Sequence, residues 1–120
     1  MDIETTIRTL WQAIAGQDEE TLLRFFTVDA QILWPNTDER FDLAGYLRAN
    51  CDYPGRWRGR VEKIAVDGSY SVAKIWPEDG DGAFRVVTFY RWRNGKIEYM
   101  EEYWGDIGPA PSWRKEMSLS

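Results

Sequence analysis

Apolar residues in the first half of the chain recur at helical spacing. Between residues 3 and 15 they fall three or four positions apart, on one helix face: Ile3, Ile7, Leu10, Trp11 and Ile14. Asp2 is suited to cap this helix and Gly16 to end it. Asp18 begins a second short helix, and Asp42 precedes a third apolar stripe that ends near Cys51. The pattern therefore predicts three N-terminal helices.

The rest of the chain alternates like β-strands separated by turn residues. A first strand over residues 28–34 ends at Pro35, because proline has no N–H to donate to a ladder, and residues 36–40 are expected to form a polar loop. Four more strands are predicted: residues 57–66, 70–76, 84–92 and 96–104. Asn94-Gly95 between the last two is typical of a tight hairpin. The chain is thus predicted to form one α+β domain over residues 1–120, a cone-shaped curved antiparallel sheet packed against three helices and enclosing a pocket.

The last strand carries acids on faces that the pattern predicts to be covered. Alternation places these residues on one face: Glu98, Met100, Glu102 and Trp104. The other face carries Ile97, Tyr99, Glu101 and Tyr103. Since neither face is plainly polar, both are expected to be covered, and a covered glutamate needs a partner or a wet cavity.

Two interpretations of Glu102 follow. In the first, Glu102 projects into an aromatic cavity, where desolvation raises its pKa and makes it a general acid or base. In the second, it forms an ion pair with Lys74, Arg48 or Arg91, or it caps a backbone group. The sequence leaves both open.

Aromatic side chains are abundant, with seven tryptophans in 120 residues. Such a surplus indicates a large apolar interior or cleft. The predicted ligand-binding lining consists of Trp11, Trp34, Tyr46, Trp76, Tyr90, Met100 and Trp104. A plain core role is the alternative for each of them. Asn36, just beyond Pro35, is expected either to bind a polar group of the ligand or to form an Asx turn.

Charge and composition exclude several classes of function. The net charge of −5 disfavours nucleic acid as a partner, because phosphate neutralisation needs a basic face. Arg56, Arg58 and Arg60 are interpreted as a solvated strand face. The absence of histidine removes the commonest general base and metal ligand, so neither a metal nor a cofactor is predicted.

Cellular location and the C-terminal tail are also predicted from sequence. The single cysteine, Cys51, excludes an internal disulfide and suits a reducing compartment. No segment has the length and apolarity of a signal or membrane span, so a cytoplasmic protein without a membrane partner is expected. Residues 105–120 contain Pro109 and Pro111 and are expected to be extended rather than helical, with Trp113 covering the pocket or reaching across a dimer.

The order of these elements resembles the nuclear transport factor 2-like superfamily, in its SnoaL-like branch. The resemblance covers nearly the whole chain and rests on short motifs in a common order: Phe25-Phe26 before Asp29-Ala30, Trp34-Pro35, Tyr46-Leu47-Arg48, Asn94-Gly95-Lys96-Ile97 and Glu101-Glu102-Tyr103-Trp104. It implies a cone with a pocket between sheet and helices, and often a homodimer. It implies no particular activity, because the superfamily includes isomerases, cyclases, epoxide hydrolases, dehydratases and binding modules.

The enzyme branches of this superfamily are tested position by position. Trp34, Leu10 and Thr88 stand where the resemblance to steroid isomerases would require a catalytic Asp, a Tyr and a protonated Asp. The dehydratases rely on histidine, and for a cyclase only Glu102 can supply the pocket acid. The sequence therefore predicts a small-molecule pocket protein for an apolar or aromatic ligand, with Glu102 as a candidate catalytic residue of an isomerase, lyase or cyclase. The alternative is a non-catalytic ligand-binding, dimerisation or interaction module.

Overall fold

The computed structural model describes residues 2–117 and places helices where the apolar stripes predict them. These are α1 (Ile3–Ala15), α2 (Glu19–Leu23) and α3 (Leu43–Cys51). Each begins after an aspartate whose carboxylate accepts a backbone N–H of the first turn: Asp2 from Thr5 at 2.7 Å, Asp18 from Thr21 at 3.3 Å and Asp42 from Gly45 at 2.8 Å. Such caps satisfy N–H groups that have no partner within the helix. The prediction of three capped helices is confirmed.

The strands form one curved, open sheet. They are β1 (Phe26–Trp34), β2 (Glu39–Asp42), β3 (Trp57–Ile64), β4 (Tyr70–Pro77), β5 (Phe84–Arg93) and β6 (Lys96–Asp106). The order in the six-stranded sheet is β2-β1-β6-β5-β4-β3. All neighbouring strands are antiparallel except β1 and β6, which run parallel. The α+β fold with a curved sheet and helices is confirmed, and the parallel pair brings the ends of β1 and β6 to the same end of the sheet.

Strand β2 corrects one expectation. The segment predicted as a polar loop instead contains a 3-10 turn, Pro35–Thr37, and the start of β2, which pairs with β1. Asp38 joins the two in a left-handed conformation (φ 57°). Phe41 packs edge-on against Trp34, with ring centroids 4.8 Å apart. The alternation of apolar and polar residues does not reveal this strand, because it is short and only Phe41 among its side chains packs on an apolar neighbour.

The hairpin between β5 and β6 confirms one prediction and corrects another. Asn94 and Gly95 both have positive φ, 52° and 77°, as a type I′ turn requires. The register then shifts between Arg91 and Trp92, so that Ile97 enters the core and Glu98 faces outward, 3.4 Å from Arg91. A bulge of this kind resets the alternation. The expectation that Glu98 shares the inner face with Glu102 is therefore wrong.

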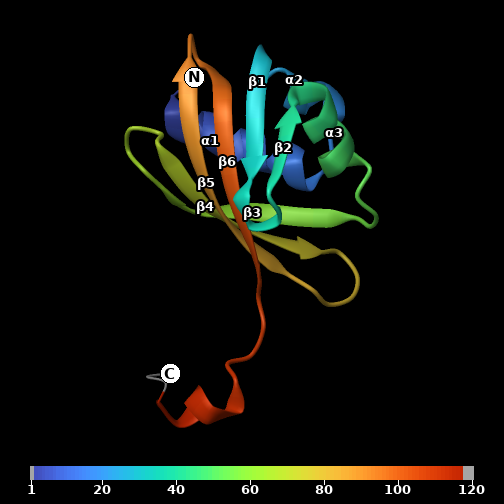
Figure 1. Cartoon of the computed structure of the whole chain (residues 1–120), viewed down its shortest axis with the longest axis vertical. Helices are drawn as coiled ribbons and strands as arrows, with labels where there is room; N and C mark the ends of the chain where they lie inside the picture. Colours follow the sequence, from blue (N-terminus) through green and yellow to red (C-terminus); the bar gives the residue numbers. More distant parts are fainter. Residues whose placement is uncertain (1, 118–120) are drawn as a thin grey trace.

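The core lies between the sheet and the helices (Figure 1). Helix α1 packs against β3 and β4, and α3 packs against β1 and β2. Trp11 is fully buried, and its indole N–H donates to the hydroxyl of Tyr90 at 2.8 Å. That hydroxyl also lies 2.6 Å from Ser71 Oγ. These bonds satisfy polar groups that would otherwise be costly to bury.

The C-terminal tail differs from its prediction. Beyond β6 the chain leaves the sheet and runs away from the body of the domain, below it in Figure 1. Ser112–Met117 forms a 3-10 helix rather than an extended segment, and Trp113 is 68% exposed. Trp113 therefore does not cover the pocket of its own chain, and its contact across a dimer stays a prediction.

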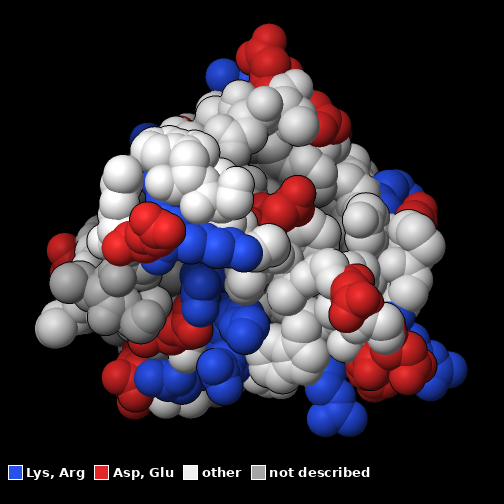
Figure 2. All heavy atoms as spheres, turned by 90° about the horizontal axis from the view of Figure 1, so that it is seen from below, with Lys and Arg blue, Asp and Glu red and all other residues white. Residues whose placement is uncertain are grey.

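Charged side chains of both signs share the surface at the tail end of the molecule (Figure 2). Arg58 lies 3.7 Å from Glu78, and Arg60 lies 3.9 Å from Glu62. Both arginines are largely exposed, as the interpretation of a solvated strand face predicts. Among the helices of residues 2–117, none is long and apolar enough to cross a membrane.

Candidate functional site

A cavity of about 310 Å³ opens between the sheet and the last turns of α1 and α3. Five aromatic side chains line it: Trp34, Tyr53, Trp57, Phe84 and Trp104. Their rings contact one another in succession, with centroids 5.7 Å apart for Tyr53 and Trp57, 5.6 Å for Trp57 and Phe84, 6.1 Å for Phe84 and Trp104, and 6.3 Å for Trp104 and Trp34. The volume lies within the usual range for small-ligand sites. The cavity wall is therefore a continuous chain of aromatic rings.

Glu102 lies on the wall of this cavity and is completely buried. Its Oε1 atom accepts a hydrogen bond from the indole N–H of Trp34 at 2.9 Å, whereas Oε2 has no hydrogen-bond partner within residues 2–117. Burial raises the pKa of Glu102 from 4.5 to about 7, and the Trp34 bond opposes that rise. Desolvation dominates because the charged form loses its water while gaining only one well-formed donor. The carboxyl is thus poised to gain or lose a proton near neutral pH.

Other polar atoms without partners gather near this carboxyl. Thr88 lies opposite Glu102 in the β5–β6 register, and Trp104 lies two residues further along β6. Both side chains favour the ionised form of Glu102 and so act against the rise in its pKa. Yet Thr88 Oγ1, Trp104 Nε1 and the hydroxyl of Tyr46 are buried without a hydrogen bond in the described chain. Unsatisfied buried polar groups are rare in proteins, and several around one carboxyl indicate a place for water or a ligand.

No cation neutralises Glu102 within residues 2–117. Arg48 instead pairs with Glu19 and with Asp52, 3.0 Å away, and Arg91 pairs with Glu98. Lys74 forms no ion pair with Glu102 and alternates along β4 with the buried Ala73 and Ile75, which places it on the opposite face. The interpretation of Glu102 as half of an ion pair is therefore wrong.

The structure divides the predicted lining into three groups. Trp34, Asn36 and Trp104 line the cavity together with Glu102. Four others belong to the core behind it: Trp11, Tyr46, Tyr90 and Met100. Trp76 lies on the outer face of β4, with the guanidinium of Arg60 5.8 Å from its ring. The cavity begins at Ile14 and Ala15, beyond Trp11 on α1, which explains why the helix tryptophan does not reach it.

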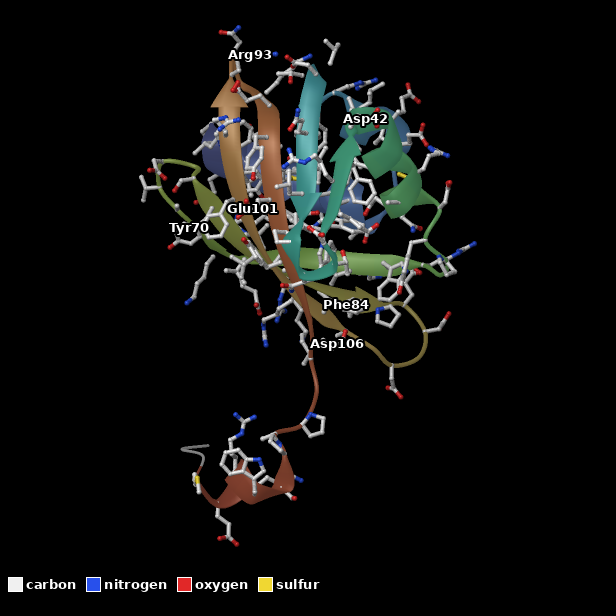
Figure 3. The ribbon with its side chains drawn as sticks, viewed as in Figure 1. Asp42, Tyr70, Phe84, Arg93, Glu101 and Asp106 are labelled. Atoms are coloured by element: carbon white, nitrogen blue, oxygen red, sulfur yellow. The ribbon has the colours of Figure 1, made fainter. Side chains whose placement is uncertain are left out.

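Three aromatic residues of the cavity wall were not predicted from the sequence. Tyr53 follows α3, and Trp57 and Phe84 are the first residues of β3 and β5. Figure 3 places Phe84 beside Asp106, where β5 begins and β6 leaves the sheet. Alternation predicts which face a strand residue occupies but not which end of the sheet is open. The available signal was that Tyr53 and Trp57 flank the Pro54-Gly55 stop and that Phe84 follows a glycine-rich loop at the start of a strand.

Asn36 lines the cavity, so its binding of a polar ligand group stays a prediction, and its side chain bonds across to β6 instead of forming an Asx turn. Its amide N–H donates to the backbone carbonyl of Trp104 at 3.2 Å, which ties the turn after β1 to the end of β6. Asn36 thereby fixes the position of two aromatic residues on the cavity wall. Across residues 2–117, no group of three or more Cys, Asp or Glu side chains is arranged to hold a metal ion.

Solved structures share this architecture, although sequence comparison finds no match among protein-family models or curated proteins. An NTF2-like protein of unknown function from Burkholderia xenovorans LB400 superposes with a TM-score of 0.77 at 22% identity, over 98% of this chain and 94% of that one. A candidate ketosteroid isomerase from Kribbella flavida DSM 17836 gives 0.73 at 24% identity, over 97% and 90%. This chain has the NTF2-like fold.

A third NTF2-like match is a candidate SnoaL-like polyketide cyclase from Shewanella putrefaciens CN-32. Its TM-score is 0.67 at 14% identity, over 85% of this chain and 88% of that one. The resemblance predicted from sequence is thus confirmed at the level of the fold. Sequence identities this low support a shared fold but not a shared activity, so any activity must be inferred from the cavity.

Proposed function

We propose that this NTF2-like protein binds a small molecule with an apolar or aromatic body in the cavity, and that Glu102 is its general acid or base. The observation that carries the proposal is the state of Glu102: it is fully buried on the cavity wall, Trp34 holds one carboxylate oxygen, and the other has no partner among residues 2–117. A carboxyl with a pKa near 7 transfers protons efficiently in both directions at neutral pH.

The proposed chemistry is a proton transfer of the isomerase, lyase or cyclase type. In such reactions a proton leaves one atom of the substrate and a proton is returned to another atom. A single positioned carboxyl can carry out both transfers, or it can stabilise the charge that develops. The aromatic wall would hold the substrate and exclude water. Leu10 and Thr88 occupy buried positions without an acid, and Trp34 ends β1, so a steroid isomerase reaction of the usual kind is not proposed.

Native mass spectrometry of the protein as purified, followed by denaturation to release bound molecules, tests the proposal. We expect a released small molecule, and we expect it to be lost or depleted in Glu102→Gln. Glu101→Gln is the matched control, because it makes the same change one residue earlier on the opposite face of β6, where Glu101 accepts the hydroxyls of Tyr99 and Tyr103. Equal occupancy in both variants would contradict the role of Glu102.

A non-catalytic dimerisation module is the alternative function, and the tail favours it. Trp113 and Met117 are 68% and 72% exposed on a segment that runs away from the domain. An exposed tryptophan of this kind is typical of a side chain that packs on a partner. Sedimentation of the full chain and of Trp113→Ala tests this: a dimer that Trp113→Ala dissociates supports the module, and a monomer in both cases removes it.

The proposed setting is the cytoplasm, with a homodimer as the proposed assembly. The single cysteine, half-buried Cys51, supports a reducing compartment because the fold needs no disulfide. Fractionation of cells that express the chain with a small tag checks this placement.

A further inference from the structure

The charged groups that line the cavity are all acids. Among the fifteen residues on its wall, Glu39 and Glu102 are the charged ones, and neither lysine nor arginine is present. Glu102 lies at the buried end, whereas Glu39 is exposed at the rim and accepts the hydroxyl of Thr37 at 2.7 Å. A ligand with a carboxylate or phosphate would meet two acids without a counter-charge, which is costly in a desolvated site.

The side-chain amides on the wall use most of their N–H groups on the chain itself. Three side-chain amides line the cavity, and each uses its NH₂ group on a backbone carbonyl. Gln17 donates to Asn50 at 3.0 Å and to Tyr53 at 2.7 Å, Asn36 donates to Trp104, and Asn50 donates to Ile14 at 3.1 Å. An amide NH₂ carries two N–H groups, so Gln17 has both bound, whereas Asn36 retains one N–H beside its oxygen.

Two of the three tryptophan N–H groups on the wall are bound within residues 2–117. The indole N–H of Trp34 is bound to Glu102, and that of Trp57 is bound to the carbonyl of Pro54 at 2.9 Å. The indole N–H of Trp104 lacks a well-formed bond, and it lies beside the Glu102 carboxyl, whose ionised form it favours. The charged groups on the wall, once ionised, are acceptors only, and the buried Glu102 carboxylate calls for a ligand that donates to it.

We propose that the ligand of this cavity is a small organic cation, a protonated amine on an apolar or aromatic body, whose N–H group binds the free oxygen of Glu102. The chain of five aromatic rings supports the same class, since aromatic faces attract cations and cages of this kind recognise alkylammonium groups. Desolvated charge-assisted hydrogen bonds are also the strongest single contacts such a site can make. This inference rests on the proposed function and narrows its ligand class.

Three probes that share one phenylethyl or benzyl body test the charge preference directly. They are 2-phenylethylamine, protonated at the working pH, neutral 2-phenylethanol and anionic phenylacetate. Binding is followed by quenching of tryptophan fluorescence and by calorimetry at about pH 8, where Glu102 is mostly ionised and an alkylamine keeps its proton. We expect the ammonium probe to bind about tenfold or more tightly than the alcohol, and phenylacetate to bind most weakly.

Two variants test whether Glu102 causes the preference for the cationic probe. Glu102→Gln should weaken binding of the ammonium probe about tenfold or more while the alcohol stays within about threefold, and Glu101→Gln should change neither. Alcohol binding as tight as ammonium binding, ammonium binding unaffected by Glu102→Gln, or no binding of any probe would each overturn the inference. A neutral molecule released on denaturation, and lost in Glu102→Gln, would also overturn the inference while leaving the proposed function in place.

Discussion

Trp34 donates its indole N–H to the carboxyl of Glu102, with 2.9 Å between Nε1 and Oε1. The two residues are 68 positions apart, and they meet because β1 and β6 run parallel and reach the same end of the sheet. The bond fixes one oxygen of the carboxyl, and the other has no hydrogen-bond partner within residues 2–117, although Glu102 lies on the wall of a cavity. A glutamate held in this way keeps its orientation in both protonation states, which a proton-transferring or cation-binding group requires.

The first prediction concerns the dependence of stability on pH. Glu102 has a pKa of about 7 in the folded chain against 4.5 when solvated, so between these values the folded state keeps a proton that the unfolded state releases. Stability from this group is therefore fully present below about pH 4.5 and is lost as the pH rises through about 7, on the order of 3 kcal/mol in total. Glu102→Gln has no proton to lose there.

Urea unfolding of the wild type and of Glu102→Gln at about pH 5 and about pH 8 checks this prediction. Relative to the wild type, the variant should gain on the order of 3 kcal/mol in unfolding free energy at the higher pH. Tyr46 and Tyr90, the titratable neighbours whose pKa values the Glu102 charge raises, stay neutral over this range. A difference between the two proteins that stays constant with pH would show that Glu102 is ionised throughout.

The second prediction is that Trp34→Phe raises the pKa of Glu102 above about 7. The indole N–H stabilises the ionised carboxyl, and a hydrogen bond to a charged group contributes about 1.5–3 kcal/mol, or about 1–2 pH units. NMR titration of the side-chain carboxyl carbon measures the shift. Trp92→Phe is the matched control, because its indole N–H is bound to the carbonyl of Gly68 at 2.8 Å and does not touch Glu102. An equal pKa in both variants would contradict the role of the Trp34 bond.

The third prediction concerns the hydroxyl of Tyr90, which serves two buried partners. Tyr90→Phe would leave the indole N–H of Trp11 and the hydroxyl of Ser71 without a partner in the core. Each orphaned group costs about 1–3 kcal/mol, so the variant should lose several kcal/mol of unfolding free energy. Tyr103→Phe is the control, because its hydroxyl binds Glu101 on the outer face and its loss should cost about 1 kcal/mol or less. Equal losses in urea unfolding would show that the Trp11–Tyr90 bond adds nothing.

Much of the fold followed from sequence because its signals are local. An aspartate before an apolar stripe sets each helix start, and Asn94-Gly95 sets the β5–β6 hairpin, each within a few residues. The bulge that turns Glu98 outward and the short strand containing Phe41 have no such local signal. Both depend on pairing with a neighbouring strand, and tertiary context decides them.

The candidate site was predictable for Glu102 and only partly for its surroundings. An acidic residue between Met100 and Trp104 conflicts with the apolar character of a covered strand face, and residues that break the local pattern in this way are often functional. Which aromatics face the cavity depends on where α1 and α3 end over the sheet. Alternation could not separate Trp57 and Phe84, which line the cavity, from Trp11 and Tyr90, which fill the core.

The last prediction concerns Gly59 of β3, which packs against Ala15 at the end of α1. A Cβ atom at Gly59 would lie 2.5 Å from Ile75 Cδ1 and 3.0 Å from Ala15 Cβ, and both of these neighbours line the cavity. The end of the Ile75 side chain must therefore move, and Ile75 borders the cavity, whereas Ala15 Cβ is fixed to the backbone of α1. Gly59→Ala should therefore cost about 1–3 kcal/mol of unfolding free energy through overpacking and also weaken ligand binding.

Urea unfolding and binding of 2-phenylethylamine measure these two effects in the same variant. Gly105→Ala is the matched control, since it adds the same methyl group to a strand glycine whose nearest neighbour is a carbonyl oxygen 4.0 Å away. We expect the control to match the wild type in binding and to lose less stability than Gly59→Ala. If Gly59→Ala bound the probe as the wild type does despite its lower stability, the α1–β3 contact would support the fold without shaping the cavity, and Ile75 would have moved toward the helix.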